Sequence, residues 1–198
     1  MRAAATTGRL LMAVCLATAA AEAQEPVTGE FSFDPIEVDS SNVPGAMCYM
    51  SARYIVVERQ EAEAVGSDFF VRPRETGRCD PDSLQGDYVL RDEWAAYFSA
   101  LHGDVLLLDS GTGPDLRTLI LIDLAARHRI AELSYVDLIP GPDPTVVGLW
   151  VGFYLDEPLP ACAIPPGGLI PGVDSLFFVD VRSGRKGFGG RTRCAQRQ

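Results

Sequence analysis

The sequence predicts an all-β fold: an antiparallel sandwich or a barrel-like meander of short strands with little helix. Two observations carry this prediction. Short runs of Val, Ile, Leu, Phe and Tyr alternate along the chain with turns rich in Gly, Pro and Asp. The chain also holds 14 prolines and 19 glycines, and both residues interrupt helices. A small β-propeller is the alternative fold.

The first 23 residues are expected to be a signal peptide. Arg2 and Arg9 form a positive segment, an apolar run follows at residues 10–21, and Ala21-Glu22-Ala23 fits a cleavage site. The mature chain then begins at Gln24. This predicts a periplasmic or secreted protein, without membrane insertion after signal cleavage, because the apolar run is too short to span a bilayer.

The remaining chain divides into an N-terminal arm, residues 24–47, and a single disulfide-stabilised β domain, residues 48–198. The arm is rich in Pro, Ser and Asp, and its alternating patch FSFDPIEV indicates an edge strand. Residues 92–102 also fit a helix, although His102-Gly103 equally suits a hairpin turn. Strands are predicted at residues 53–58, 68–71, 87–90, 95–101, 104–109, 118–123, 129–135, 145–155 and 175–181.

Three of these regions share a pattern of strand, polar turn and basic residue. They are residues 68–78, 119–129 and 176–186. Such units recur in propeller blades and in β-meanders. Because their spacing is not constant, we interpret them as repeated hairpins, which the sandwich accommodates more readily than the propeller does.

Four cysteines remain after signal removal, and an even number in an oxidising compartment indicates two disulfides. Three connectivities are possible. The pairs Cys48–Cys79 and Cys162–Cys194 are favoured because they enclose loops of nearly equal length. No C-x-x-C pair is present and the chain has two histidines, so no metal site is predicted, and no cofactor.

The net charge of the chain limits the classes of partner that it is expected to bind. The formal net charge is −10 at pH 7, and an acidic protein repels nucleic acid and anionic membranes. No nucleic-acid or membrane partner is therefore expected. An extracytoplasmic protein or a glycan is the partner class that remains.

Residues 105–113 read VLLLDSGTG, an apolar run entering a turn. This stretch resembles the active-site motif of aspartic peptidases, and the resemblance implies that Asp109 is the catalytic acid and base. Two such aspartates must share a proton. The chain contains one such triplet, so the resemblance implies a homodimer. The alternative, which we favour, is that Asp109 is a turn residue following a strand buried on both faces, held by Ser110, Thr112 and nearby backbone N–H groups.

Basic residues gather at the C-terminal end of this acidic chain: Arg185, Lys186, Arg191 and Arg193. One interpretation is a binding patch for an anionic partner. The other is a solvated edge strand whose charges prevent aggregation. The aromatic residues Trp94, Trp150, Phe153 and Tyr154 are further candidates for a binding groove.

Together these features predict an exported module that acts by binding, as an interaction module or an inhibitor. They favour this function over enzymatic activity. The homodimeric aspartic peptidase is the second hypothesis. A structural component of the cell envelope is the third.

Overall fold

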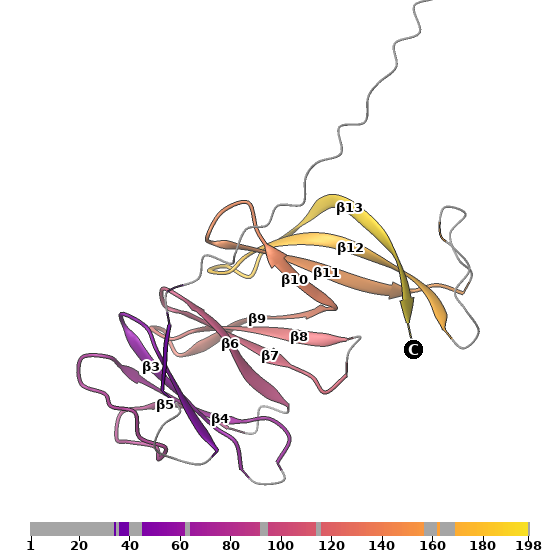
Figure 1. Ribbon diagram of the computed structural model, residues 1–198. Coiled ribbons are helices and arrows are strands. Elements are labelled where there is room, and N and C mark those ends of the chain that lie inside the picture. The colour runs from indigo at the N-terminus through magenta and orange to yellow at the C-terminus, as the bar shows by residue number, and fades with distance from the viewer. Residues whose placement is uncertain are drawn as a thin grey trace, which may run out of the picture.

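The computed structural model describes residues 34, 36–39, 45–61, 64–91, 95–113, 116–156, 162 and 169–197. Within these residues all regular structure is β-strand, in three antiparallel sheets, none of which closes into a barrel (Figure 1). The all-β, sandwich-like prediction is therefore confirmed. The predicted signal peptide and most of the arm lie outside the described residues.

Each sheet is formed by consecutive strands, and within a sheet every strand after the first pairs with the one before it. The N-terminal sheet contains β1 (Glu37–Asp39), β2 (Ala46–Met50), β3 (Tyr54–Arg59), β4 (Asp68–Pro73) and β5 (Tyr88–Leu90). The central sheet contains β6 (Ala96–His102), β7 (Val105–Ser110), β8 (Arg117–Asp123) and β9 (His128–Tyr135). The C-terminal sheet contains β10 (Asp137–Pro140), β11 (Val146–Tyr154), β12 (Ile170–Asp180) and β13 (Lys186–Arg197).

All nine predicted strands are present, with ends that differ by a few residues. The ambiguous segment 92–102 contains a strand, β6, which turns at Gly103 into β7, so the hairpin interpretation is the correct one. The sequence did not predict β2 and β10. The three similar segments run through β4, β8 and β12, and each of these is the next-to-last strand of its sheet.

The central sheet lies between the other two, as Figure 1 shows. One apolar layer joins its first face to the N-terminal sheet and includes Leu106 and Leu108. The second layer joins its other face to the C-terminal sheet and includes Val105 and Leu107. Residues 105 to 108 are 5, 0, 1 and 0% exposed, which confirms that this strand is buried on both faces.

Both predicted disulfides are present, one on each outer sheet. Cys48 in β2 bonds Cys79 in the loop after β4, with 5.8 Å between the Cα atoms. Cys162, between β11 and β12, bonds Cys194 in β13, with 5.6 Å between the Cα atoms. Each bridge therefore attaches a long connection to the sheet beside it.

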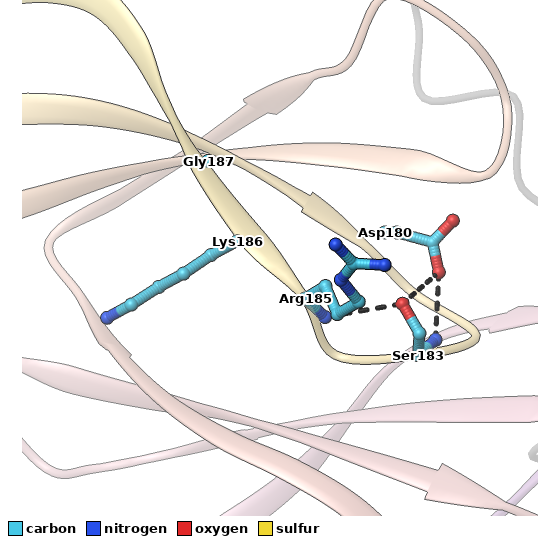
Figure 2. Close-up of a pocket in the computed structure, with 5 residues that line it drawn as sticks. All are labelled: Asp180, Ser183, Arg185, Lys186 and Gly187. Carbon is cyan, nitrogen blue, oxygen red and sulfur yellow. Dashed lines mark hydrogen bonds between the residues drawn. The ribbon is translucent and has the colours of Figure 1, made fainter.

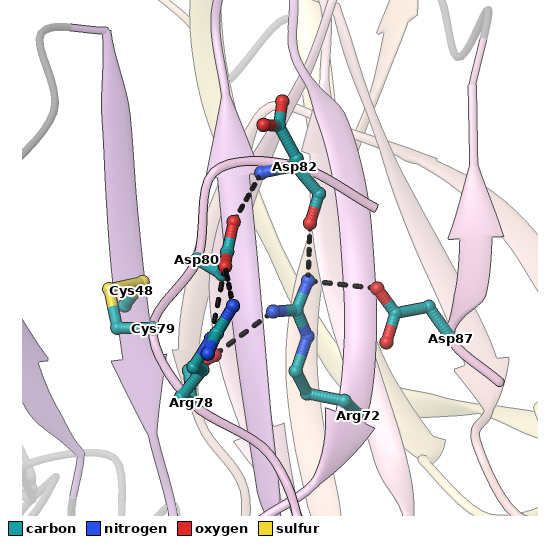
Figure 3. Close-up of a disulfide and its surroundings, with 7 residues drawn as sticks. All are labelled: Cys48, Arg72, Arg78, Cys79, Asp80, Asp82 and Asp87. Carbon is teal, nitrogen blue, oxygen red and sulfur yellow. Dashed lines mark hydrogen bonds and ion pairs between the residues drawn. A yellow bond between two sulfur atoms is a disulfide. The ribbon is translucent and has the colours of Figure 1, made fainter. Parts of the chain in front are cut away.

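The loop of residues 74–87 is also held by a buried arginine (Figure 3). Arg72, in β4, donates hydrogen bonds to the carbonyl oxygens of Arg78 and Asp82 at 2.9 and 3.1 Å. Its guanidinium also pairs with the carboxylate of Asp87 at 2.8 Å, and both side chains are 3% exposed. Asp87 in turn accepts the backbone N–H of Leu84. This network fixes the loop against the face of the N-terminal sheet that points away from the central sheet.

We expect Leu106→Ala and Leu107→Ala to destabilise the protein to a similar degree, although their side chains point to opposite faces. Each substitution leaves a cavity in a buried apolar layer, which costs about 2–5 kcal/mol. Urea unfolding of both variants measures this cost. Leu116→Ala, at a residue that is 49% exposed, is the control and should stay within about 0.5 kcal/mol of the parent. A small effect for either core variant would show that one face of the sheet is not buried.

The buried ion pair of Arg72 and Asp87 can be tested by removing one or both of its charges. Arg72→Met leaves the Asp87 carboxylate buried without its cation and should cost about 3–5 kcal/mol. Arg72→Met combined with Asp87→Leu removes the isolated charge and should recover part of that loss. Arg78→Met is the matched control, because Arg78 is exposed and its ion pair with Asp80 contributes at most about 1 kcal/mol. Equal losses at residues 72 and 78 would contradict a central role for Arg72.

Candidate functional site

The basic residues predicted as a patch lie on or next to β13, but they do not form one cluster. Lys186 pairs across the ladder with Val179, whereas Arg193 pairs with Asp174. Facing residues of an antiparallel pair share one side of the sheet. Val179 lies in the layer toward the central sheet, so Lys186 and Arg193 project from opposite faces of the C-terminal sheet.

Arg185 and Lys186 lie at the hairpin between β12 and β13, beside a shallow hollow of about 330 Å³. Figure 2 shows Arg185 close to Asp180 and Ser183, whereas Lys186 extends away from the turn. The hydroxyl and the N–H of Ser183 each donate to the Asp180 carboxylate at 2.8 Å. These hydrogen bonds lower the pKa of Asp180. The Lys186 ammonium lies over the ring of Phe177, 5.4 Å from its centroid.

Arg191 and Arg193 lie over a single aromatic ring on the other face. Their guanidinium carbons are 5.9 and 4.4 Å from the centroid of Trp150. Arg193 also forms ion pairs with Asp174 at 2.9 Å and with Asp137 at 3.2 Å. These contacts fix the Arg193 side chain over the ring.

The cations of this region differ in whether a carboxylate lies close enough to form an ion pair. Asp174 pairs with Arg193 and also with Arg197, which is buried beside it. Among the residues that the structure describes, no carboxylate lies within ion-pair distance of Arg185, Lys186 or Arg191. Arg182, in the turn before Arg185, is exposed and has no ion pair among the described residues either, so four positive side chains of this hairpin are left to solvent or to a partner.

The buried pair of Asp174 and Arg197 was not predicted from the sequence. Its partners are 23 residues apart and come together only through the register of β12 and β13. Gly152 and Gly172 leave room for the Arg197 guanidinium, because a Cβ at either position would stand against it. Gly152 in β11 and Gly172 in β12, as glycines within strands, are sequence signals for a close approach of this kind.

Asp109 lies within β7, opposite Tyr97 and Leu119, and precedes the turn. The prediction that Asp109 is a turn residue is therefore wrong, because the ladder with β8 continues to Ser110 and Asp109 is part of the strand. Its carboxylate accepts the Arg117 guanidinium at 2.7 Å and the Tyr135 hydroxyl at 2.6 Å.

The contact with Asp109 changes the pKa of both of its partners. Burial, followed by the hydrogen bond to Asp109, raises the pKa of the Tyr135 hydroxyl. The same carboxylate raises the pKa of Arg117. The two partners come from β8 and β9, so the Asp109 carboxylate links three neighbouring strands of the central sheet.

Across the described residues, no group of three or more His, Cys, Asp or Glu side chains is placed to hold a metal ion. No helix in the described part of the chain is long and apolar enough to cross a membrane. Of the candidate groove aromatics, Phe153 and Tyr154 are exposed and Trp150 is buried, and Trp94 lies outside the described residues.

Comparison with known proteins finds no family model, no curated protein and no solved structure that matches this chain.

Substitutions at Asp109 separate a structural role from a catalytic one. Asp109→Ala leaves Arg117 and the buried Tyr135 hydroxyl without their acceptor and should cost about 1–3 kcal/mol. Asp109→Asn keeps one acceptor oxygen and should cost less. Thermal melting measures both variants, beside a peptide-cleavage assay at about pH 4. Cleavage that a well-folded Asp109→Asn protein loses would establish the peptidase hypothesis instead.

Proposed function

We propose that this protein is an exported binding module that holds an anionic partner against the hairpin of β12 and β13. The main support is the uneven distribution of charge along the chain. The chain has a net charge of −10, yet residues 185–198 contain five basic residues and no acidic one.

The ion pairs of this hairpin separate its cations into two groups. Arg193 and Arg197 are matched by buried or partly buried carboxylates and serve the fold. Arg185, Lys186 and Arg191 have no such match among the described side chains, and all three are exposed. Exposed charges of one sign contribute little to stability, but they steer and select partners of the opposite sign.

Exposed aromatic side chains border the same sheet. Phe153, Tyr154 and Phe188 are 46, 48 and 61% exposed. Large aromatic residues are enriched in binding surfaces. The two disulfides support export, because such bonds persist in oxidising compartments.

The position of Asp109 favours binding over peptidase activity. Its carboxylate is held by an arginine and a tyrosine of its own chain, and the peptidase hypothesis requires it to meet the same residue of a second chain. Such a dyad needs Asp109 to leave these two partners.

A triple variant tests the proposal. Arg185→Ser, Lys186→Ser and Arg191→Ser together remove three of the four uncompensated cations of this hairpin without breaking an ion pair that the structure describes. The immobilised protein is exposed to extracytoplasmic material of its native host, and retained proteins and glycans are identified. We expect an acidic partner whose retention falls about fivefold or more in the variant and with added salt.

Arg91→Ser is the control for non-specific charge effects, because Arg91 is exposed at the other end of the stack of sheets. Thermal melting confirms that each variant is folded. Equal retention of every partner by the parent and the triple variant would refute the proposed function.

A further inference from the structure

We propose that the hollow at the turn between β12 and β13 is a binding site for one acidic sugar unit of a glycan. This inference rests on the proposed binding function and names the class of partner and the part of the hairpin that it contacts. The residues that line the hollow lie between positions 180 and 187, in a stretch that the structure describes without a gap.

The turn that carries the hollow is held in place by its own backbone and by the central sheet. The N–H of Gly184 donates to the carbonyl oxygen of Asp180 at 2.9 Å, and the N–H of Asp180 donates to the carbonyl oxygen of Arg185 at 3.0 Å. Gly184 also packs against β9, because a Cβ at this position would stand 2.7 Å from the Cβ of Ala131. The side chains around the hollow therefore start from a fixed backbone, which lowers the entropy cost of binding a ligand.

One side of the hollow is left open by a glycine. Gly187 pairs with Phe178 across the ladder, so it lies on the face opposite to Val179, which belongs to the layer toward the central sheet. Apart from its neighbours in the chain, no residue has an atom within 4 Å of the place where a Cβ of Gly187 would stand. A ligand can therefore approach the backbone closely at this point.

Groups of opposite charge line the hollow. Figure 2 shows Arg185 beside Asp180, although the two are not within ion-pair distance. Arg185 carries five N–H donors in a planar fork that suits a carboxylate. The two hydrogen bonds from Ser183 both go to Oδ1 of Asp180, and a carboxylate has further lone pairs on Oδ2. The hollow thus offers donors for an anion next to an acceptor for hydroxyl groups.

A sugar acid satisfies both of these requirements. Its carboxylate accepts hydrogen bonds from Arg185, and its hydroxyl groups donate to Asp180. An inorganic anion, or the side chain of an acidic peptide, has no hydroxyl group to donate and meets the negative charge of Asp180 without compensation. The hydrogen bonds from Ser183 lower the pKa of Asp180, so this carboxylate stays charged at neutral pH and remains an acceptor.

The size of the hollow agrees with a single sugar ring. Its volume of about 330 Å³ is near the lower end of the range for small-molecule sites, roughly 300–1,000 Å³. The hollow is shallow, so a unit within a longer glycan can enter it while the rest of the chain stays outside. Arg191, which lies on the same face of the sheet, would meet a further acidic unit of that chain.

Titration with an oligomer of a sugar acid tests the site. The probe is the trisaccharide of galacturonic acid, and its binding to the full chain is measured by ligand-observed NMR at about 50 mM salt. Arg185→Met removes the cation and Gly187→Leu fills the hollow, and each should weaken binding about fivefold or more. Gly113→Leu is the matched control and should bind as the parent does, because a Cβ at Gly113 also meets no atom within 4 Å. Thermal melting confirms that each variant is folded.

Three further ligands identify the chemistry that is recognised. The neutral trisaccharide of galactose, sulfate ions and a hexaglutamate peptide should each bind about fivefold or more weakly than the sugar acid, because each lacks either the carboxylate or the hydroxyl groups. Failure of the sugar acid to bind would overturn the proposed site. Equal or tighter binding of the peptide or of sulfate, or equal binding by the parent and the Gly187→Leu variant, would do the same. If the triple variant still loses a native partner in that case, the proposed function stands and only this site and ligand class are wrong.

Discussion

Burial of the central sheet on both faces is the constraint on which the rest of this structure depends. A sheet with two apolar faces requires a second sheet on each side, and the run from Val105 to Leu108 supplies side chains to both layers. The outer sheets exist in this arrangement because they cover those faces. The outer faces of these two sheets are covered by loops and side chains instead of by a further sheet.

The two ends of the stack are completed differently. On the N-terminal sheet, the loop of residues 74–87 is attached by the Cys48–Cys79 disulfide and by the buried Arg72. On the C-terminal sheet, Arg191 and Arg193 lie over Trp150, and Arg193 is itself paired with Asp174. A buried ion pair stands at each end, Arg72 with Asp87 and Arg197 with Asp174, and its two partners come from a neighbouring strand or loop.

This arrangement also leaves several cations of the last hairpin without an ion pair among the described residues. Asp109, Asp87 and Asp174 are committed to arginines of their own chain, whereas Arg185, Lys186 and Arg191 are exposed on the last hairpin. A surface that is basic on an acidic protein attracts partners that the remainder of the molecule repels. The proposed function therefore follows from which ion pairs the fold completes and which cations it leaves.

The sequence by itself determined the all-β class, most of the strands and the deep burial of residues 105–108, because these depend on local patterns, and its cysteine spacing favoured the disulfide pairs that the structure has. It also identified the basic C-terminal residues. Only the tertiary structure decided that these residues divide between two faces, that Asp109 meets Arg117 and Tyr135, and that Arg72 holds a loop. Each of these depends on strand register or sheet stacking, which bring together residues whose separation along the chain carries no local signal.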